Sequence, residues 1–164
     1  MKANNRYKIH QKLISIGDDF WIEDQTGQRV YRVDGKALRI RKTLIVEDTQ
    51  GKLLCMIQER LLRIKNTMEI EDANGRRIAL VQKALIAPFR DRWIARIRDG
   101  EDLLIQGNIL DHEYIIKSNH RRVAEISKKW FSFADVYGVE IDPGQEDFII
   151  LTIAIAIDMM AHDT

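Results

Sequence analysis

The sequence predicts a mainly β fold, a closed antiparallel barrel of about twelve strands built from hairpin repeats that encloses a hydrophobic C-terminal α-helix. Two observations support this prediction. A turn signature of Asp, two further residues and Gly recurs every 24 residues, at 24–27, 48–51 and 72–75. Near the end of the chain, residues 148–160 are apolar around nearly the whole circumference of a helix. A recurring unit of this length indicates a repeated supersecondary element, and a helix without a polar face has to be surrounded.

The repeat extends well beyond the turn signature. Residues 38–61 and 62–85 are identical at nine of 24 aligned positions. In the second copy apolar and polar residues alternate, with apolar side chains at Leu62, Ile64, Met68 and Ile70. A period of two residues is typical of a strand with one face in the core and one in water.

The turn residues themselves predict tight hairpins. The Asp carboxylate can accept a hydrogen bond from the backbone N–H two residues on, and Gly supplies the positive φ that leads into the partner strand. Weaker turn signals at residues 99–100 and 119–120 continue the pattern. We therefore expect eleven or twelve strands between about residue 8 and residue 141.

The final segment predicts a helix over about residues 143–161. Asp142 is the predicted N-cap, Pro143 the first helical residue and Gln145 the capping-box partner. The thirteen residues of the apolar run are fewer than the roughly 18 to 20 that cross a bilayer, which favours a buried helix over a transmembrane span. A closed sheet around this helix would bury it and leave no sheet edge exposed.

Composition and length predict one domain over residues 1–164. The chain is 45% hydrophobic and 31% charged, which is enough apolar material for a core without the signature of disorder. Cys55 is the single cysteine, so no intramolecular disulfide can form, and we expect a buried thiol. The first ten residues lack the apolar region of a secretory signal. These features favour a cytoplasmic protein.

Charge is distributed unevenly along the chain. Residues 1–129 carry a formal charge of +8 and residues 130–164 carry −7. In the repeat, cations occupy the face opposite the apolar residues, and the predicted patch consists of Arg39, Arg41, Arg63 and Lys65, with Lys36 and Lys42 as lesser members. Such a patch could bind phosphates of a lipid headgroup or a polynucleotide. The alternative is a solvated outer face that is balanced by Glu47, Glu59 and Glu69.

Other candidate sites carry weaker patterns. Asp111, His112 and Glu113 are metal-capable or acid–base side chains, but consecutive residues of a strand point to opposite faces and converge only at a bulge or turn. Trp93 and Trp130 are either base-stacking platforms or, as is usual for aromatic residues in strands, packing residues. No phosphate-binding loop, nucleophile elbow or cysteine pair occurs. The sequence thus predicts no enzyme, no metal and no cofactor.

Several segments carry a resemblance to a known family. The longest is Gly-Asn-Ile-Leu-Asp-His-Glu-Tyr at residues 107–114, and the others lie at 17–20, 33–36, 40–44, 90–93, 127–131 and 158–163. Together they resemble the LURP-one-related family over nearly the whole chain. That family is similar to the C-terminal domain of Tubby proteins and to phospholipid scramblases. The resemblance therefore implies a twelve-stranded barrel around a hydrophobic C-terminal helix.

The resemblance also implies a function. Tubby-like relatives bind phosphoinositides through basic side chains, and by fold-level analogy this chain is a non-catalytic module that binds an anionic phospholipid headgroup at a membrane surface. The expected contacts are the cations of the predicted patch. Residues 142–147 do not reproduce the acidic calcium-binding segment of scramblases, so we do not expect calcium-driven lipid transport. The alternative is a structural or protein-interaction module with no lipid ligand. A nucleic-acid partner is disfavoured, and the sequence leaves the oligomeric state open.

Overall fold

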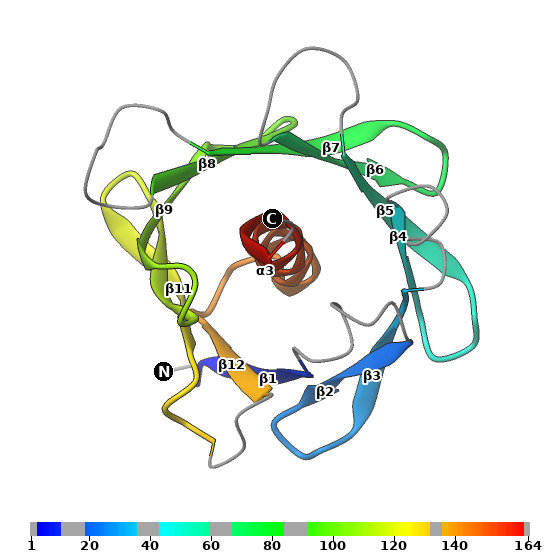
Figure 1. Cartoon of the computed structure of the whole chain (residues 1–164), viewed down its shortest axis with the longest axis horizontal. Helices are drawn as coiled ribbons and strands as arrows, with labels where there is room; N and C mark the ends of the chain where they lie inside the picture. Colours follow the sequence, from blue (N-terminus) through cyan, green and yellow to red (C-terminus); the bar gives the residue numbers. More distant parts are fainter. Residues whose placement is uncertain are drawn as a thin grey trace.

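The computed structural model shows a closed antiparallel barrel around a single described helix (Figure 1). It describes residues 3–10, 19–35, 43–59, 67–83, 92–131 and 136–162. Within these ranges the strands are β1 (Asn5–His10), β2 (Phe20–Asp24), β3 (Arg29–Asp34), β4 (Thr43–Glu47), β5 (Leu53–Glu59), β6 (Thr67–Asp72), β7 (Arg77–Lys83), β8 (Arg92–Ile97), β9 (Leu103–Asn108), β10 (Glu113–Ser118), β11 (Arg121–Ser127) and β12 (Val136–Ile141). The helix is α3 (Asp147–His162).

Each strand pairs with its neighbours in the chain, and the first strand closes the barrel against the last. β1 and β12 pair over six residues, from Asn5 opposite Ile141 to His10 opposite Val136. Closure leaves none of the described strands with an unpaired edge, which removes the sheet edges that would otherwise promote aggregation. The predicted fold class is confirmed.

The three repeated turns have the predicted chemistry. In each, the Asp carboxylate accepts hydrogen bonds from the backbone N–H groups two and four residues on, at 2.8–3.0 Å. The φ angles are +81°, +81° and +77° at Gly27, Gly51 and Gly75. The strand register shifts by one residue beside each turn. These are hairpins with a bulge, in which the positive φ of Gly restarts the partner strand.

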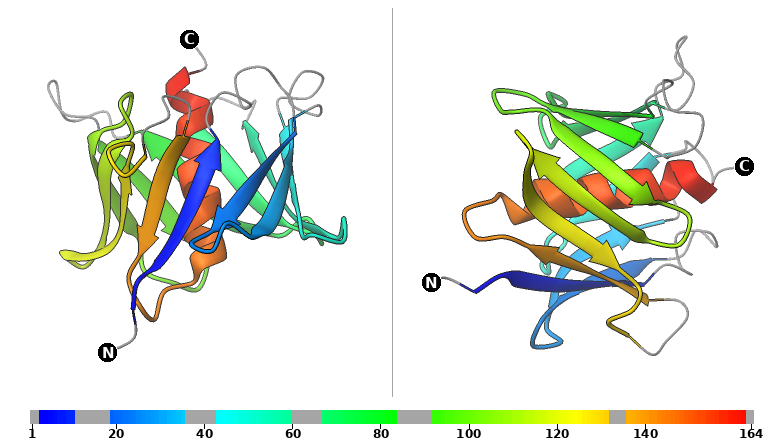
Figure 2. Two further views of the ribbon diagram at one scale, coloured as in Figure 1. Left: turned by 90° about the horizontal axis from the view of Figure 1, so that it is seen from below. Right: turned by 90° about the vertical axis from the view of Figure 1, so that its left-hand side faces the viewer.

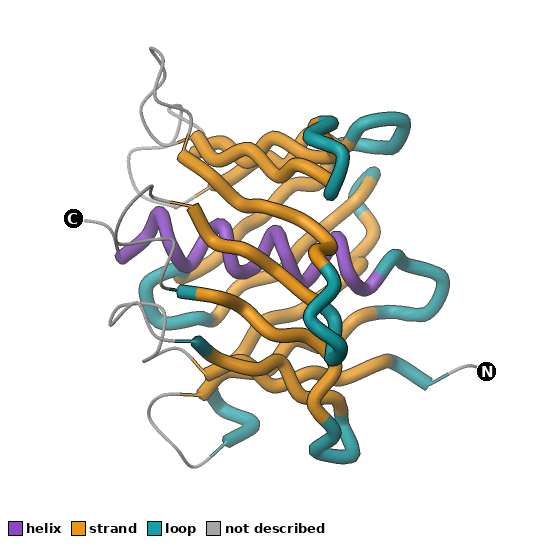
Figure 3. Tube along the Cα trace, turned by 90° about the vertical axis from the view of Figure 1, so that its right-hand side faces the viewer, coloured by secondary structure: helices purple, strands orange, loops and turns teal. Residues whose placement is uncertain are grey.

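Helix α3 runs through the interior of the barrel (Figures 2 and 3). Its central residues are fully buried, among them Ile153 and Ile155 at 0% exposure. The strands supply alternate side chains to the same core, because successive residues of a strand point to opposite faces. The expectation that the apolar helix is surrounded is confirmed. In the part of the chain that is described, no helix combines the length and apolarity that crossing a membrane requires.

The helix begins at Asp147, later than the predicted start near residue 143. The predicted cap residues lie before the helix, namely Asp142, Pro143 and Gln145. The backbone N–H of Asp142 still donates to the carbonyl of Val123 on β11, at 2.9 Å. Gly144 then adopts a φ of +87°. The prediction of the helix start was wrong because the chain needs a turn to pass from the barrel wall into the interior.

Side chains of β1 hold the start of the helix. The carboxylate of Asp147 accepts hydrogen bonds from the Asn5 amide at 2.7 Å and from the Tyr7 hydroxyl at 2.6 Å. Burial and the hydrogen bond to Asp147 raise the pKa of Tyr7 well above its usual value. An acidic side chain in the first turn also complements the positive end of the helix dipole. The end of the helix where it enters the barrel is therefore tied to the strand that closes the barrel.

Candidate functional site

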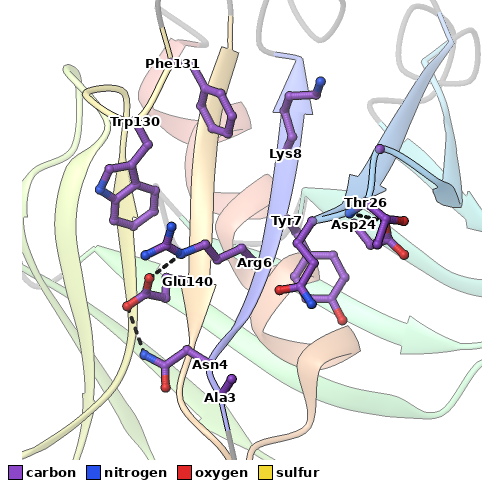
Figure 4. Close-up of a pocket in the computed structure, with 12 residues that line it drawn as sticks. Ala3, Asn4, Arg6, Tyr7, Lys8, Asp24, Thr26, Trp130, Phe131 and Glu140 are labelled. Carbon is purple, nitrogen blue, oxygen red and sulfur yellow. Dashed lines mark hydrogen bonds and ion pairs between the residues drawn. The ribbon is translucent and has the colours of Figure 1, made fainter.

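A groove of about 920 Å³ crosses the outer wall of the barrel at β1 (Figure 4). We call it the β1 groove. Its lining comes from β1 and the two residues before it, the end of β2 with the turn that follows, the segment after β11, and β12. The lining residues are Ala3, Asn4, Arg6, Tyr7, Lys8, Asp24, Gln25, Thr26, Gly27, Trp130, Phe131 and Glu140.

Two cations of β1 stand on the outer face of this groove. Arg6 and Lys8 are two residues apart, so their side chains leave the strand on the same side. The guanidinium carbon of Arg6 lies 5.7 Å from the centre of the Trp130 ring, within the range of a cation–π contact. Its Nε donates to Glu140 at 2.6 Å. The Lys8 ammonium lies 2.8 Å from a carboxylate oxygen of Glu23.

The aromatic side of the groove rests on a glycine of β12. A Cβ atom added to Gly138 would lie 2.5 Å from the Cε3 atom of Trp130 and 2.9 Å from the Cε2 atom of Phe131. Gly138 pairs with Lys8 across the β1–β12 ladder. The two rings can therefore pack on the backbone beside the cations of β1 only because position 138 has no side chain.

The carboxylates of the groove are already hydrogen-bonded within the protein. Glu140 accepts from the Asn4 amide at 2.9 Å and from Arg6, and it also lies 3.4 Å from Arg122. The hydrogen bond from Asn4, followed by that from Arg6, lowers the pKa of Glu140 below its usual value. The side chain of Glu140 is 11% exposed, whereas that of Arg6 is 63% exposed. Of this pair, the Arg6 guanidinium is therefore the group that is open to solvent.

The family model of the LURP-one-related proteins matches residues 5–158. The chain belongs to the LURP-one-related family. In this LURP-one-related protein the match spans every strand from β1 to β12 and most of α3. No curated protein matches the chain. Among solved structures, it is similar to the crystal structure of a protein from Arabidopsis thaliana, with 15% sequence identity over 71% of this chain and 83% of the other and a TM-score of 0.41.

The predicted headgroup-binding cations of this LURP-one-related protein lie outside the described residues. These are Lys36, Arg39, Arg41, Lys42, Arg63 and Lys65. The strands that follow them, β4 and β6, begin at Thr43 and Thr67. The predicted patch therefore stays a prediction.

The consecutive residues Asp111, His112 and Glu113 do not form a common site. The Asp111 carboxylate accepts from Asn108 at 2.5 Å, and Glu113 accepts from the Ser127 hydroxyl at 2.8 Å. His112 has a φ of +52° and is 1% exposed. The three side chains thus have different partners. Within the described ranges, no group of three or more His, Cys, Asp or Glu side chains could hold a metal ion.

A buried polar cluster inside the barrel was not predicted. His112 Nε2 lies 2.7 Å from Asp158 Oδ1, and both side chains are at most 2% exposed. The imidazole also stacks on Tyr137, with ring centres 4.3 Å apart. Burial, followed by the charge of Asp158, raises the pKa values of Tyr114 and Tyr137 well above the usual value. The one signal in the sequence was Asp158 itself, a carboxylate inside an apolar helix.

The two tryptophans considered as stacking platforms have different environments. Trp93 is 2% exposed and belongs to the core, as is usual for an aromatic residue in a strand. Trp130 is 36% exposed and forms one wall of the β1 groove. Sequence alone could not separate them, because each tryptophan follows a basic residue.

Proposed function

We propose that this LURP-one-related protein is a non-catalytic binding module for anionic phospholipid headgroups, which it meets at a membrane surface from the cytoplasm. The proposed contacts are the cations that precede β4 and β6 along the chain, namely Arg39, Arg41, Arg63 and Lys65, with Lys36 and Lys42 beside them. Family membership supports a barrel module. The lipid ligand is our proposal and does not follow from family membership.

The position of the two strands carries the proposal. Thr43 of β4 pairs with Gln58, and Met68 of β6 pairs with Glu59, so both strands begin beside the end of β5. Two strands that flank a third lie about 10 Å apart. In this proposal, the cations that precede both strands act together on one polyanionic ligand.

A vesicle co-sedimentation assay tests this proposal. One set of vesicles contains phosphatidylcholine alone, and a second contains an added phosphoinositide. We expect binding to the second set only, with a steep loss as salt screens the charges. Replacing Arg39, Arg41, Arg63 and Lys65 together by Ala should abolish this binding.

The matched control removes four other exposed cations that lie in or beside the β4–β5, β6–β7, β8–β9 and β10–β11 turns, namely Lys52, Arg76, Arg98 and Arg121. This variant should bind the vesicles like the unmodified protein, although its net charge changes by the same amount. Equal binding by the first variant would refute the lipid proposal. Salt-resistant capture of a protein partner, together with no vesicle binding, would instead favour a protein-interaction module.

A further inference from the structure

The β1 groove has the size of a small-molecule site. Its volume of about 920 Å³ lies within the roughly 300–1,000 Å³ of typical ligand pockets. Its floor is formed by β1 and β12, and both of these strands are paired on both sides. An extended peptide would therefore find no free backbone edge to pair with at this floor. Recognition has to come from side chains.

One wall of the groove is built for a planar or apolar group. Trp130 keeps 36% of its surface exposed, although it packs with Phe131 on the backbone at Gly138. Exposed hydrophobic side chains of this size are uncommon here, since among the described residues only Leu110 and Trp130 are both large and exposed. The Trp130 ring stays partly exposed even with the Arg6 guanidinium over it, and a ligand ring can pack against the part that Arg6 leaves open at little cost in side-chain entropy.

Arg6, the cation beside this wall, has capacity to bind an anion. Arg6 uses Nε for Glu140, and neither of its Nη atoms donates to another described residue. The Lys8 ammonium extends away from Arg6 and Trp130 (Figure 4) and lies 2.8 Å from a carboxylate oxygen of Glu23. The carboxylate Oδ1 of Asp24 accepts hydrogen bonds from its own turn. Near Trp130 a ligand thus meets the Nη groups of Arg6 as donors, whereas the Glu140 carboxylate already accepts from Asn4 and Arg6.

We infer that the β1 groove binds a small organic anion that carries a planar ring, with a nucleoside monophosphate as the representative of this class. The ring packs against Trp130 and Phe131. The phosphate accepts charge-assisted hydrogen bonds from the Nη groups of Arg6. This inference does not rest on the proposed headgroup contacts, because it is argued from a different set of residues, Arg6, Trp130 and Phe131.

Isothermal titration calorimetry with adenosine monophosphate, adenosine and inorganic phosphate tests the inference. The monophosphate should bind at least tenfold more tightly than either half alone, because both the ring and the anion are recognised. Trp130→Ala should weaken binding of the monophosphate about fivefold or more, as loss of one stacking platform does. Arg6→Met should weaken it about tenfold, and Gly138→Ala should also weaken it by displacing both rings.

The barrel offers a matched control. Arg29 lies over the ring of Trp21 with the guanidinium carbon 5.1 Å from the ring centre, a cation–π pair outside the lining of the groove. Trp21→Ala and Arg29→Met should therefore leave the affinity unchanged, and thermal melts establish that every variant is folded. The inference would be overturned if the monophosphate did not bind at millimolar concentration or if inorganic phosphate bound with equal affinity. It would also be overturned if the Trp21 and Arg29 variants lost as much affinity as the Trp130 and Arg6 variants.

Discussion

The buried contact between His112 and Asp158 should make a large contribution to stability. It joins the loop before β10 to the central helix, and both side chains are at most 2% exposed. Removing one partner of a buried contact to a carboxylate costs about 3–5 kcal/mol, because the remaining group loses a hydrogen bond that water does not replace. Domains of this kind are stable by about 5–15 kcal/mol, so the change is a large fraction of the total. For a chain of this size the melting temperature should fall by about 6–20 °C.

We expect this loss in both Asp158→Ala and His112→Asn. Asn is chosen because it tolerates the positive φ of position 112 and is too short to reach the helix. The double variant should cost less than the sum of the single ones, with a coupling free energy of at least about 1 kcal/mol. Urea unfolding followed by circular dichroism measures all three.

Thr152→Ala is the control for this experiment. Thr152 is buried on the same helix, but its hydroxyl donates to the carbonyl of Ile149 within that helix, at 2.9 Å. Its replacement should cost only about 1 kcal/mol. Single losses below about 1 kcal/mol at His112 and Asp158, or strict additivity in the double variant, would refute the reasoning.

Three further predictions concern single residues. Cys55 is fully buried and burial raises its pKa to about 12, so Ellman's reagent at pH 8 should label it only after unfolding; rapid labelling of the folded protein would contradict this. The pKa of Glu140 is lowered in the folded state, so ionised Glu140 favours folding. This stabilisation is present above the ordinary pKa of 4.5 and is lost as the pH falls through the folded pKa. Glu140→Gln should flatten that part of the pH dependence of the urea midpoint, and an unchanged profile would count against the assignment. Ile155→Ala should cost about 2–5 kcal/mol in urea unfolding, because the side chain is fully buried in the barrel; a cost below about 1 kcal/mol would contradict that packing.

The parts of the fold that sequence predicted correctly depend on interactions between residues close in the chain. The Asp and Gly of each repeated turn act within five residues of one another, through hydrogen bonds and a positive φ. Strand alternation likewise follows from the local geometry of the backbone. The start of the helix was placed wrongly because Asp142 continues the sheet ladder, which is a contact with a distant strand.

The candidate site could not be predicted in the same way. Arg6 is separated by more than a hundred residues from both Trp130 and Glu140, and only barrel closure brings β1 against β12. In the sequence, Gly138 is a residue of low strand propensity. In the structure, its missing side chain leaves room for the rings of Trp130 and Phe131. Nothing local distinguishes it from other glycines.

By itself, the sequence determined that this chain forms repeated hairpins and ends in a helix that must be enclosed, because hydrogen bonding in turns and the periodicity of apolar residues are local properties. Tertiary structure decided which distant side chains meet. Barrel closure placed Trp130 beside Arg6, and the axial helix placed Asp158 against His112. Such pairings depend on strand register and on burial of the whole core, which no short window of sequence contains.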